Sequence, residues 1–322
     1  RVGGTLNLNN PWGHGDVASL RVLSSGKGLN YARAAYQVPV KRAKVGVAYG
    51  RLDYRLGKEF DSLQARGTAD IASAYGSYPL VRSRRSNLSV QLAFDSKSLQ
   101  DQVGATSLRQ KKKVQVLMLG LQGDHRDRLA GPAVTTYGLT GSAGHLKLQD
   151  PAARVADASS ARTAGSYGKL AFNLARLQSV GASTQLYAAA SGQLASKNLD
   201  ASEKMPLGGA SAVRAYPEGE SYADRGFVFT LEARYTLPVT TTVPGQVQLV
   251  GFIDSGAVTL NRNPWVPGTN SRKLSGAGVG MNWSVGHAFF VKAFYAHKVG
   301  SEPATSAPDA SGRFWVQGVK YF

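Results

Sequence analysis

The residues that most often carry catalysis or bind metals are scattered in this sequence of 322 residues. Its five histidines are His14, His125, His145, His287 and His297. They lie far apart, and none has the i, i+4 spacing by which a helix presents two imidazoles to one metal ion. The absence of cysteine excludes a disulfide framework and a thiolate metal site. The sequence therefore predicts neither a metal site nor a bound cofactor.

Three segments imitate motifs of enzymes. Residues 123–127 (Gly-Asp-His-Arg-Asp) could be drawn as a metal loop, but a polar hairpin tip explains them better. Residues 276–280 resemble a dinucleotide-binding loop only superficially, because they lie in an expected strand and no helix follows. Residues 165–168 lack the second glycine spacing of a nucleophile elbow. We therefore predict that the chain is not an enzyme.

Along most of the chain, apolar residues recur at every second position, which is the period of a strand with one apolar and one polar face. In residues 227–237 one face carries Phe, Phe, Leu, Ala, Tyr and Leu, and the other includes Glu232 and Arg234. In residues 246–254, Asp254 shares the polar face with two glutamines. A sustained helical period is hard to find, so the sequence predicts an all-β protein.

Segmentation by this alternation gives about sixteen strands. They are expected near residues 1–9, 16–25, 29–38, 44–56, 66–78, 87–96, 111–122, 132–143, 166–178, 183–195, 205–211, 227–237, 246–254, 273–284, 288–298 and 312–322. Many are long, short and long joints alternate, and tyrosines lie near strand ends, as is typical of a transmembrane antiparallel β-barrel with a wet lumen. Closure would pair the first strand with the last. Residues 97–110 and 144–165 are expected as long connections, and a soluble β-sandwich remains an alternative.

The formal net charge of +18 could indicate nucleic-acid binding. The basic runs are Arg82, Arg84, Arg85 and Lys111, Lys112, Lys113. They fall at expected strand ends or loops, where cations meet lipopolysaccharide phosphate or the periplasm, or are simply solvated. We predict no nucleic-acid partner. Parity places Arg21, Arg33, Arg51, Arg55, Lys169, Arg234 and Lys292 inside. Such a lumen predicts anion preference, which single-channel reversal potentials would measure.

The most specific segment follows residue 206. It contains Leu207, Gly208, Gly209, Val213, Arg214 and Tyr216, and then Asp224 and Arg225. This segment resembles the sixth-loop motif of two-partner secretion transporters, L-G-G-x-x-S-V-R-G-Y followed by D-R-G. Residues 10–16, residues 192–199, and the strand with Phe252, Asp254 and Gly256 resemble three further motifs of that family, in its order. The terminal Phe322 resembles the sorting signal of outer-membrane barrels, although Lys320 departs from it.

The resemblance implies a barrel domain over residues 1–322, in which the loop after strand eleven, residues 212–226, folds into the lumen. Its Arg214 would meet Asp254, and Phe252 would offer an aromatic surface. The loop itself shows few apolar anchors. Such an ion pair is worth about 0–1 kcal/mol when exposed, and losing one partner costs about 3–5 kcal/mol when sealed. Ala215 replaces the family's glycine, so a positive φ there would be strained.

The implied function is an outer-membrane pore. It would secrete a large unfolded exoprotein of the haemolysin or adhesin kind from periplasm to cell surface, without nucleotide hydrolysis. The expected partners are this exoprotein and the lipid and lipopolysaccharide of the membrane. We expect a monomer, with the periplasmic POTRA domains of the family absent from this chain. An outer-membrane assembly factor of the same superfamily and a solute porin are the alternatives.

Overall fold

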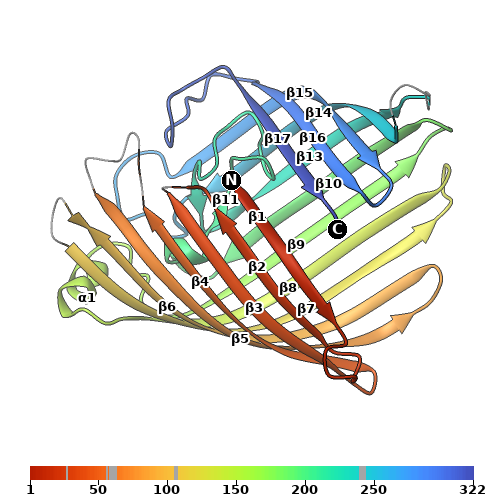
Figure 1. The fold of residues 1–322 in the computed structure, drawn as a ribbon. Coiled ribbons are helices and arrows are strands. Elements are labelled where there is room, and N and C mark those ends of the chain that lie inside the picture. The colour runs from red at the N-terminus through yellow and green to blue at the C-terminus, as the bar shows by residue number, and fades with distance from the viewer. Residues whose placement is uncertain (27, 56, 58–63, 105–107, 239–243) are drawn as a thin grey trace.

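The computed structural model describes residues 1–322 except 27, 56, 58–63, 105–107 and 239–243. Fifteen strands form one antiparallel sheet that curls round on itself (Figure 1). They are β1 (Val2–Asn9), β2 (Val17–Ser24), β3 (Leu29–Val40), β4 (Ala43–Arg55), β5 (Ala65–Arg82), β6 (Ser86–Val103), β7 (Leu108–Asp127), β8 (Ala133–Leu148), β9 (Gly165–Ser179), β10 (Thr184–Ala195), β13 (Arg225–Thr236), β14 (Gln246–Thr259), β15 (Ser271–Val285), β16 (Phe289–Lys298) and β17 (Gly312–Lys320). The predicted all-β class is confirmed.

Four small elements lie outside this sheet. The strands β11 (Met205–Pro206) and β12 (Tyr222–Ala223) pair only with each other, and the helix α1 (Pro151–Ala158) follows β8. A 3-10 turn covers Ala201–Glu203. In the described part of the chain, no helix is both long and apolar enough to span a membrane.

Three predicted boundaries are wrong. Residues 205–211 do not form a strand of the large sheet, because β10 pairs directly with β13. Residues 97–110 are mostly strand, and β8 continues to Leu148 before α1 begins. The outer faces of these strand ends carry Ser, Gln, Arg and Lys. The apolar alternation that marks a strand is therefore missing there, although the hydrogen-bonded ladder continues.

The two edges of the sheet are β1 and β17. Among the described residues β1 pairs only with β2, and β17 only with β16. With fifteen alternating strands, the first and last run in the same direction, as Figure 1 shows. An antiparallel ladder between them is therefore excluded, and the described residues show no pairing of the first strand with the last.

The two faces of the sheet differ as the alternation predicts. Phe227, Phe229 and Leu231 of β13 are exposed on the outer face, whereas Val228 and Glu232, on the inner face, are buried. The same outer face carries large exposed apolar side chains on nearly every strand, including Leu117 and Leu119 of β7, Leu170 and Leu174 of β9, Ile253 of β14 and Val279 of β15. A continuous apolar belt of this kind requires lipid around it.

The two ends of the sheet differ in the length of their connections. At one end the strands are joined by residues 41–42, 83–85, 180–183 and 286–288, which we call the short-join end. At the other, the long-loop end, the connections include 149–164, 196–224, 260–270 and 299–311. This asymmetry is that of outer-membrane barrels, in which the short turns face the periplasm and the long loops face outward.

The outer and inner faces predict opposite responses to a charge near the middle of β10. Ala188 lies opposite Leu231 on the outer face, and Ala189 lines the inner cavity. We expect Ala188→Lys to lower the free energy of unfolding in lipid vesicles by about 2–4 kcal/mol, because the ammonium enters hydrocarbon. The matched Ala189→Lys should cost far less in the same denaturant titration. Equal losses would contradict this assignment of the faces.

Candidate functional site

Residues 196–224, the inner segment, leave β10 at the long-loop end and fold back against the concave side of the sheet (Figure 1). Leu207, Val213 and Tyr216 of this segment are completely buried. They share one hydrophobic cluster with Phe252, Leu274 and other inward residues of β13 to β16. The expectation of few apolar anchors is therefore wrong. Apolar residues in an irregular segment follow no period, so the sequence pattern did not reveal them.

Arg214 lies at the centre of this contact and is 5% exposed. Its Nε and Nη2 donate to the two carboxylate oxygens of Asp254, both at 2.8 Å, and its backbone N–H donates to Oδ2 at 3.1 Å. Asp254 is fully buried and also accepts from the Thr230 hydroxyl at 2.9 Å. Four hydrogen bonds thus satisfy this buried carboxylate and fix its position.

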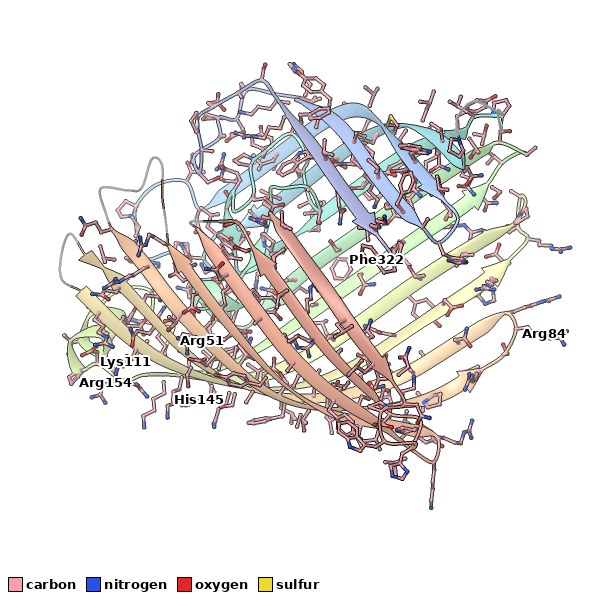
Figure 2. All side chains as sticks on the ribbon, in the orientation of Figure 1. Arg51, Arg84, Lys111, His145, Arg154 and Phe322 are labelled. Carbon is pink, nitrogen blue, oxygen red and sulfur yellow. The ribbon has the colours of Figure 1, made fainter. Side chains whose placement is uncertain are left out.

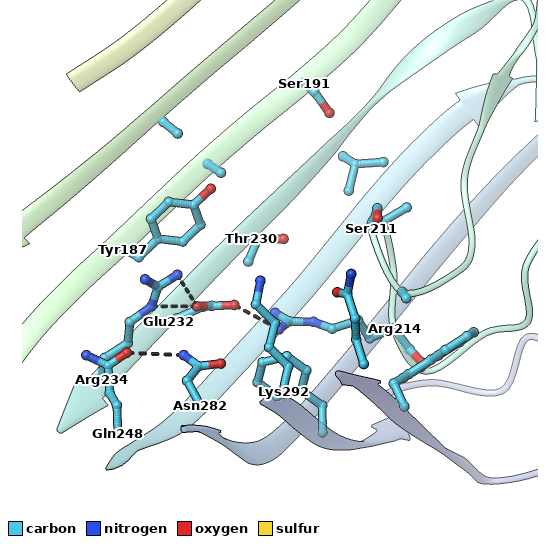
Figure 3. Close-up of a pocket in the computed structure, with 18 of the residues that line it drawn as sticks. Tyr187, Ser191, Ser211, Arg214, Thr230, Glu232, Arg234, Gln248, Asn282 and Lys292 are labelled. Atoms are coloured by element: carbon cyan, nitrogen blue, oxygen red, sulfur yellow. Dashed lines mark hydrogen bonds and ion pairs between the residues drawn. The ribbon is translucent and has the colours of Figure 1, made fainter. Parts of the chain in front are cut away.

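A second carboxylate completes the network. Nη1 of Arg214 donates to Glu232 Oε1 at 2.8 Å, and Arg234 donates to the other oxygen of Glu232 at 2.8 Å (Figure 3). Burial lowers the pKa of Arg214, but its hydrogen bonds and charge attraction to Asp254 and Glu232 outweigh this and raise it. The guanidinium thus stays protonated while it is shielded from water.

Aromatic groups enclose the guanidinium. Its Cζ lies 3.4 Å from the Phe252 ring centroid and 5.2 Å from that of Phe294. The carbonyl of Arg214 accepts a hydrogen bond from the Trp315 indole at 2.7 Å. Sequence reasoning did not select Glu232, Phe294 or Trp315 as site residues. The alternation had placed Glu232 on the inner face, so it could have been found, whereas Trp315 is 101 residues away along the chain and gave no signal.

Small residues on β15 make room for this packing. A Cβ at Gly276 would lie 2.5 Å from the Cβ of Ala215, and one at Gly278 would lie 2.4 Å from the Phe252 ring. Residues 276–280 thus receive the inner segment and its aromatic neighbours. Ala215 is not among the described residues with positive φ, so the strain expected there does not arise. Gly209, at φ 119°, does require glycine.

Two neighbouring residues, Asp224 and Arg225, fix the end of the inner segment that leads into β13. Asp224 is fully buried and accepts from the backbone N–H of Leu199 at 3.0 Å and of Arg262 at 2.7 Å. Arg225 donates to the Ala195 carbonyl at 2.9 Å. Arg225 and Gly226 belong to β13, so the predicted loop 212–226 ends two residues late and begins well after the segment turns inward at residue 196.

A further set of ion pairs fixes the other side of the inner segment. Glu203 pairs with Lys97 of β6 at 2.7 Å and with Lys169 of β9 at 2.8 Å. Asp200 pairs with Lys112 of β7 at 2.8 Å. Burial raises the pKa of both carboxyls, but the lysines outweigh it and lower them. The segment is therefore attached to two separate parts of the inner wall.

Glu220 connects the inner segment to the loop of residues 299–311. It is fully buried, pairs with Arg272, and accepts from the N–H groups of Thr305 at 3.0 Å and Ser306 at 2.9 Å. Burial raises the pKa of Glu220, but these hydrogen bonds outweigh it and lower the pKa to about 2. This contact is therefore complete above pH 4.5, the ordinary pKa, and is lost as the pH falls through about 2.

The other residues selected from the sequence lie apart from this network. Gly256 leaves space for Leu207, since a Cβ there would lie 2.5 Å from its Cδ1. The turn of residues 10–16 is closed by hydrogen bonds of its own, including Gly15 N–H to Asn10 Oδ1 at 2.6 Å, and the Tyr36 hydroxyl of β3 donates to Asp16 at 3.0 Å. Phe322 is exposed, in the chain end that follows β17 at the short-join end (Figure 2).

The inner wall carries fewer free cations than parity predicted. Arg51 and Arg55 point outward, because they share the parity of the exposed Tyr49. Lys169 and Arg234 point inward but pair with Glu203 and Glu232. The parity argument was wrong for β4 because charged side chains were taken as inward, whereas this strand end projects beyond the apolar belt.

Comparison with known proteins identifies the family. Residues 1–283 match the family described as haemolysin secretion/activation protein ShlB/FhaC/HecB. The chain belongs to this family. It is 28% identical over 332 residues to the heme/hemopexin transporter protein HuxB of Haemophilus influenzae strain 86-028NP, covering all of this chain and 57% of that protein. The chain thus spans little more than half the length of this relative.

Solved structures of low sequence identity share the fold. CdiB from Escherichia coli is similar with a TM-score of 0.78 and 19% identity, over 99% of this chain and 59% of that one. BamA from Haemophilus ducreyi, in a form lacking POTRA domains 1–3, has a TM-score of 0.71 and 13% identity, over 99% and 67%. As a member of this family, the chain is an outer-membrane β-barrel protein of the two-partner secretion class, as the sequence motifs predicted.

The network predicts how tightly the inner segment is held. Asp254→Asn removes one charge from a buried pair, which costs about 3–5 kcal/mol. We expect amide hydrogen exchange of residues 212–216 to accelerate roughly 100-fold or more, with the barrel still folded. Asp53→Asn, at an exposed carboxylate of β4, is the matched control. Unchanged protection in the Asp254 variant would show that the pair does not hold the segment.

Proposed function

We propose that this chain forms the outer-membrane pore through which a large unfolded exoprotein passes from the periplasm to the cell surface, and that the inner segment is its plug. Family membership supports the secretion of a protein partner. The observation that carries the proposal is the buried ion pair of Arg214 with Asp254, which attaches an irregular segment to the inside of a barrel.

The inner wall suits an extended polypeptide. A polar cavity of about 820 Å³ lies beside the inner segment. Its lining includes the amides of Gln248 and Asn282, which hydrogen-bond to each other at 3.1 Å, and residues 315–317 of the edge strand β17 (Figure 3). Side-chain amides can exchange hydrogen bonds with a passing peptide backbone without strong preference for its sequence.

The plug can be displaced because its contacts are exchangeable. Hydrogen bonds and ion pairs to Asp254 and Glu232 can be replaced by contacts with water once the lumen opens, and the apolar contacts of Leu207 and Val213 by contacts with the substrate. Entry of the exoprotein would supply the free energy that displaces the plug. Folding outside the cell would then make the passage one-way, without nucleotide hydrolysis.

The family description supports a secreted protein of the haemolysin kind as the substrate. HuxB is named as a heme/hemopexin transporter. For this chain we propose an exoprotein of the haemolysin or adhesin kind. The similarity to BamA shows the fold alone, so an assembly role is the weaker alternative.

Secretion by the complete transporter, expressed beside its partner exoprotein, tests the proposal. We expect Arg214→Ala and Asp254→Ala to lower the amount of exoprotein in the medium roughly tenfold or more. In each variant a buried charge loses its partner, and the plug is no longer held in its position on the wall. The amount of heat-modifiable barrel in the membrane should not change. Asp53→Asn is again the control.

The alternatives give different results in the same strains. An assembly factor would show a fall in other outer-membrane proteins when Arg214 is replaced, and a solute porin would pass small solutes steadily with exoprotein release unaffected. Normal secretion by both alanine variants would refute the role of the pair in the plug.

A further inference from the structure

The outer surface of β7 changes from apolar to basic toward the long-loop end. Leu119 and Leu117 are exposed in the apolar belt. Further toward that end the same face carries Lys113, Lys111 and Arg109, all exposed, whereas the alternate residues between Lys111 and Leu117 are buried on the inner face. The strand therefore projects beyond the hydrocarbon with a basic outer face.

Register extends this basic face across the neighbouring strands. Lys113 lies directly opposite Lys147 of β8, and Arg55 of β4 lies directly opposite Arg66 of β5. Like charges directly opposite each other destabilise an antiparallel pair. An anion shared between the two members of each pair would remove this repulsion. Two such pairs on one outer surface point to a ligand with several negative groups.

Few acidic groups neutralise this surface. Arg51 lies 3.3 Å from Asp53 and 3.5 Å from Asp70, so it is already compensated. Within the described ranges no salt bridge involves Lys113 or Lys147. Figure 2 shows Lys111 and Arg154 at the end of the sheet where α1 lies, whereas Arg84 lies at the opposite end.

The surface also has a concave part. Arg55 and Arg66 line a groove of about 770 Å³ whose other polar lining residues include Gln100, Gln102 and the carboxylate of Asp53, which is paired with Arg51. Arg66 donates to Gln102 at 3.1 Å, which orients its guanidinium across the groove. A guanidinium can bind two oxygens of one phosphate, whereas a lysine acts as a point charge beside it.

We propose that this basic surface binds the phosphate groups of lipopolysaccharide in the outer leaflet. Its residues are Arg55, Arg66, Arg109, Lys111, Lys113 and Lys147. The long-loop end faces outward, so these side chains stand directly outside the hydrocarbon, at the depth of the phosphates on the lipid A sugars and inner core. The proposal rests on the outer-membrane location of the chain and is independent of what the pore secretes.

Binding to the folded chain in detergent tests the proposal. The probe is purified lipopolysaccharide of the deep-rough type, and native mass spectrometry gives its dissociation constant. We expect Lys113→Gln with Lys147→Gln to weaken binding about 25-fold, which is about fivefold for each charge removed. Arg82→Gln with Arg84→Gln, at the short-join end, removes the same charge and should leave the constant unchanged.

Chemically altered probes separate phosphate from other sources of affinity. Enzymatically dephosphorylated lipopolysaccharide should bind at least tenfold more weakly than the intact form, and phosphatidylglycerol should compete poorly. The proposal is overturned if the dephosphorylated form binds equally, if phosphatidylglycerol displaces lipopolysaccharide at equal concentration, or if the two double variants weaken binding to the same extent.

Discussion

The position of the inner segment inside this barrel depends on the buried guanidinium of Arg214. Taking Arg214 out of water costs several kcal/mol, which only well-aligned partners can offset. Asp254 and Glu232 supply the charge, and Phe252 and Phe294 enclose it. These groups stand on three strands of the inner wall, β13, β14 and β16, so the guanidinium can contact all of them in one position only. The path of the inner segment follows from that position.

Three further groups of contacts hold the inner segment against the wall and the neighbouring loop. The apolar cluster around Leu207 and Tyr216 stabilises the packing of the segment on the wall, but the hydrophobic effect is non-directional and does not set its exact position. Glu203, with its two lysines, fixes the opposite wall, and Glu220 joins the segment to the loop of residues 299–311. These contacts involve different residues of the segment and different parts of the inner wall, so each can be removed without removing the others. The outer face is independent of this machinery and meets lipid through its apolar belt.

Much of this architecture could be predicted from the sequence. Strict alternation in residues 227–237 identified both faces of β13, and the position of Asp254 on the inner face followed from its parity. The pattern failed where strands leave the membrane, as in β4, whose outer face is charged rather than apolar. It also failed for the buried anchors of the inner segment, which have no period. Contacts between distant residues, such as Trp315 with Arg214, depend on how the sheet curls and leave no trace in local sequence.

The central claim, that the inner segment must move for secretion, is tested by fixing it to the wall. Ser211 of the segment and Ser191 of β10 line the same cavity and lie outside the ion network, and the chain has no natural cysteine. In the complete transporter with Ser211→Cys and Ser191→Cys, a short bifunctional thiol crosslinker should stop exoprotein release, while each single variant secretes normally under the same treatment. Undiminished release by the crosslinked double variant would contradict the account.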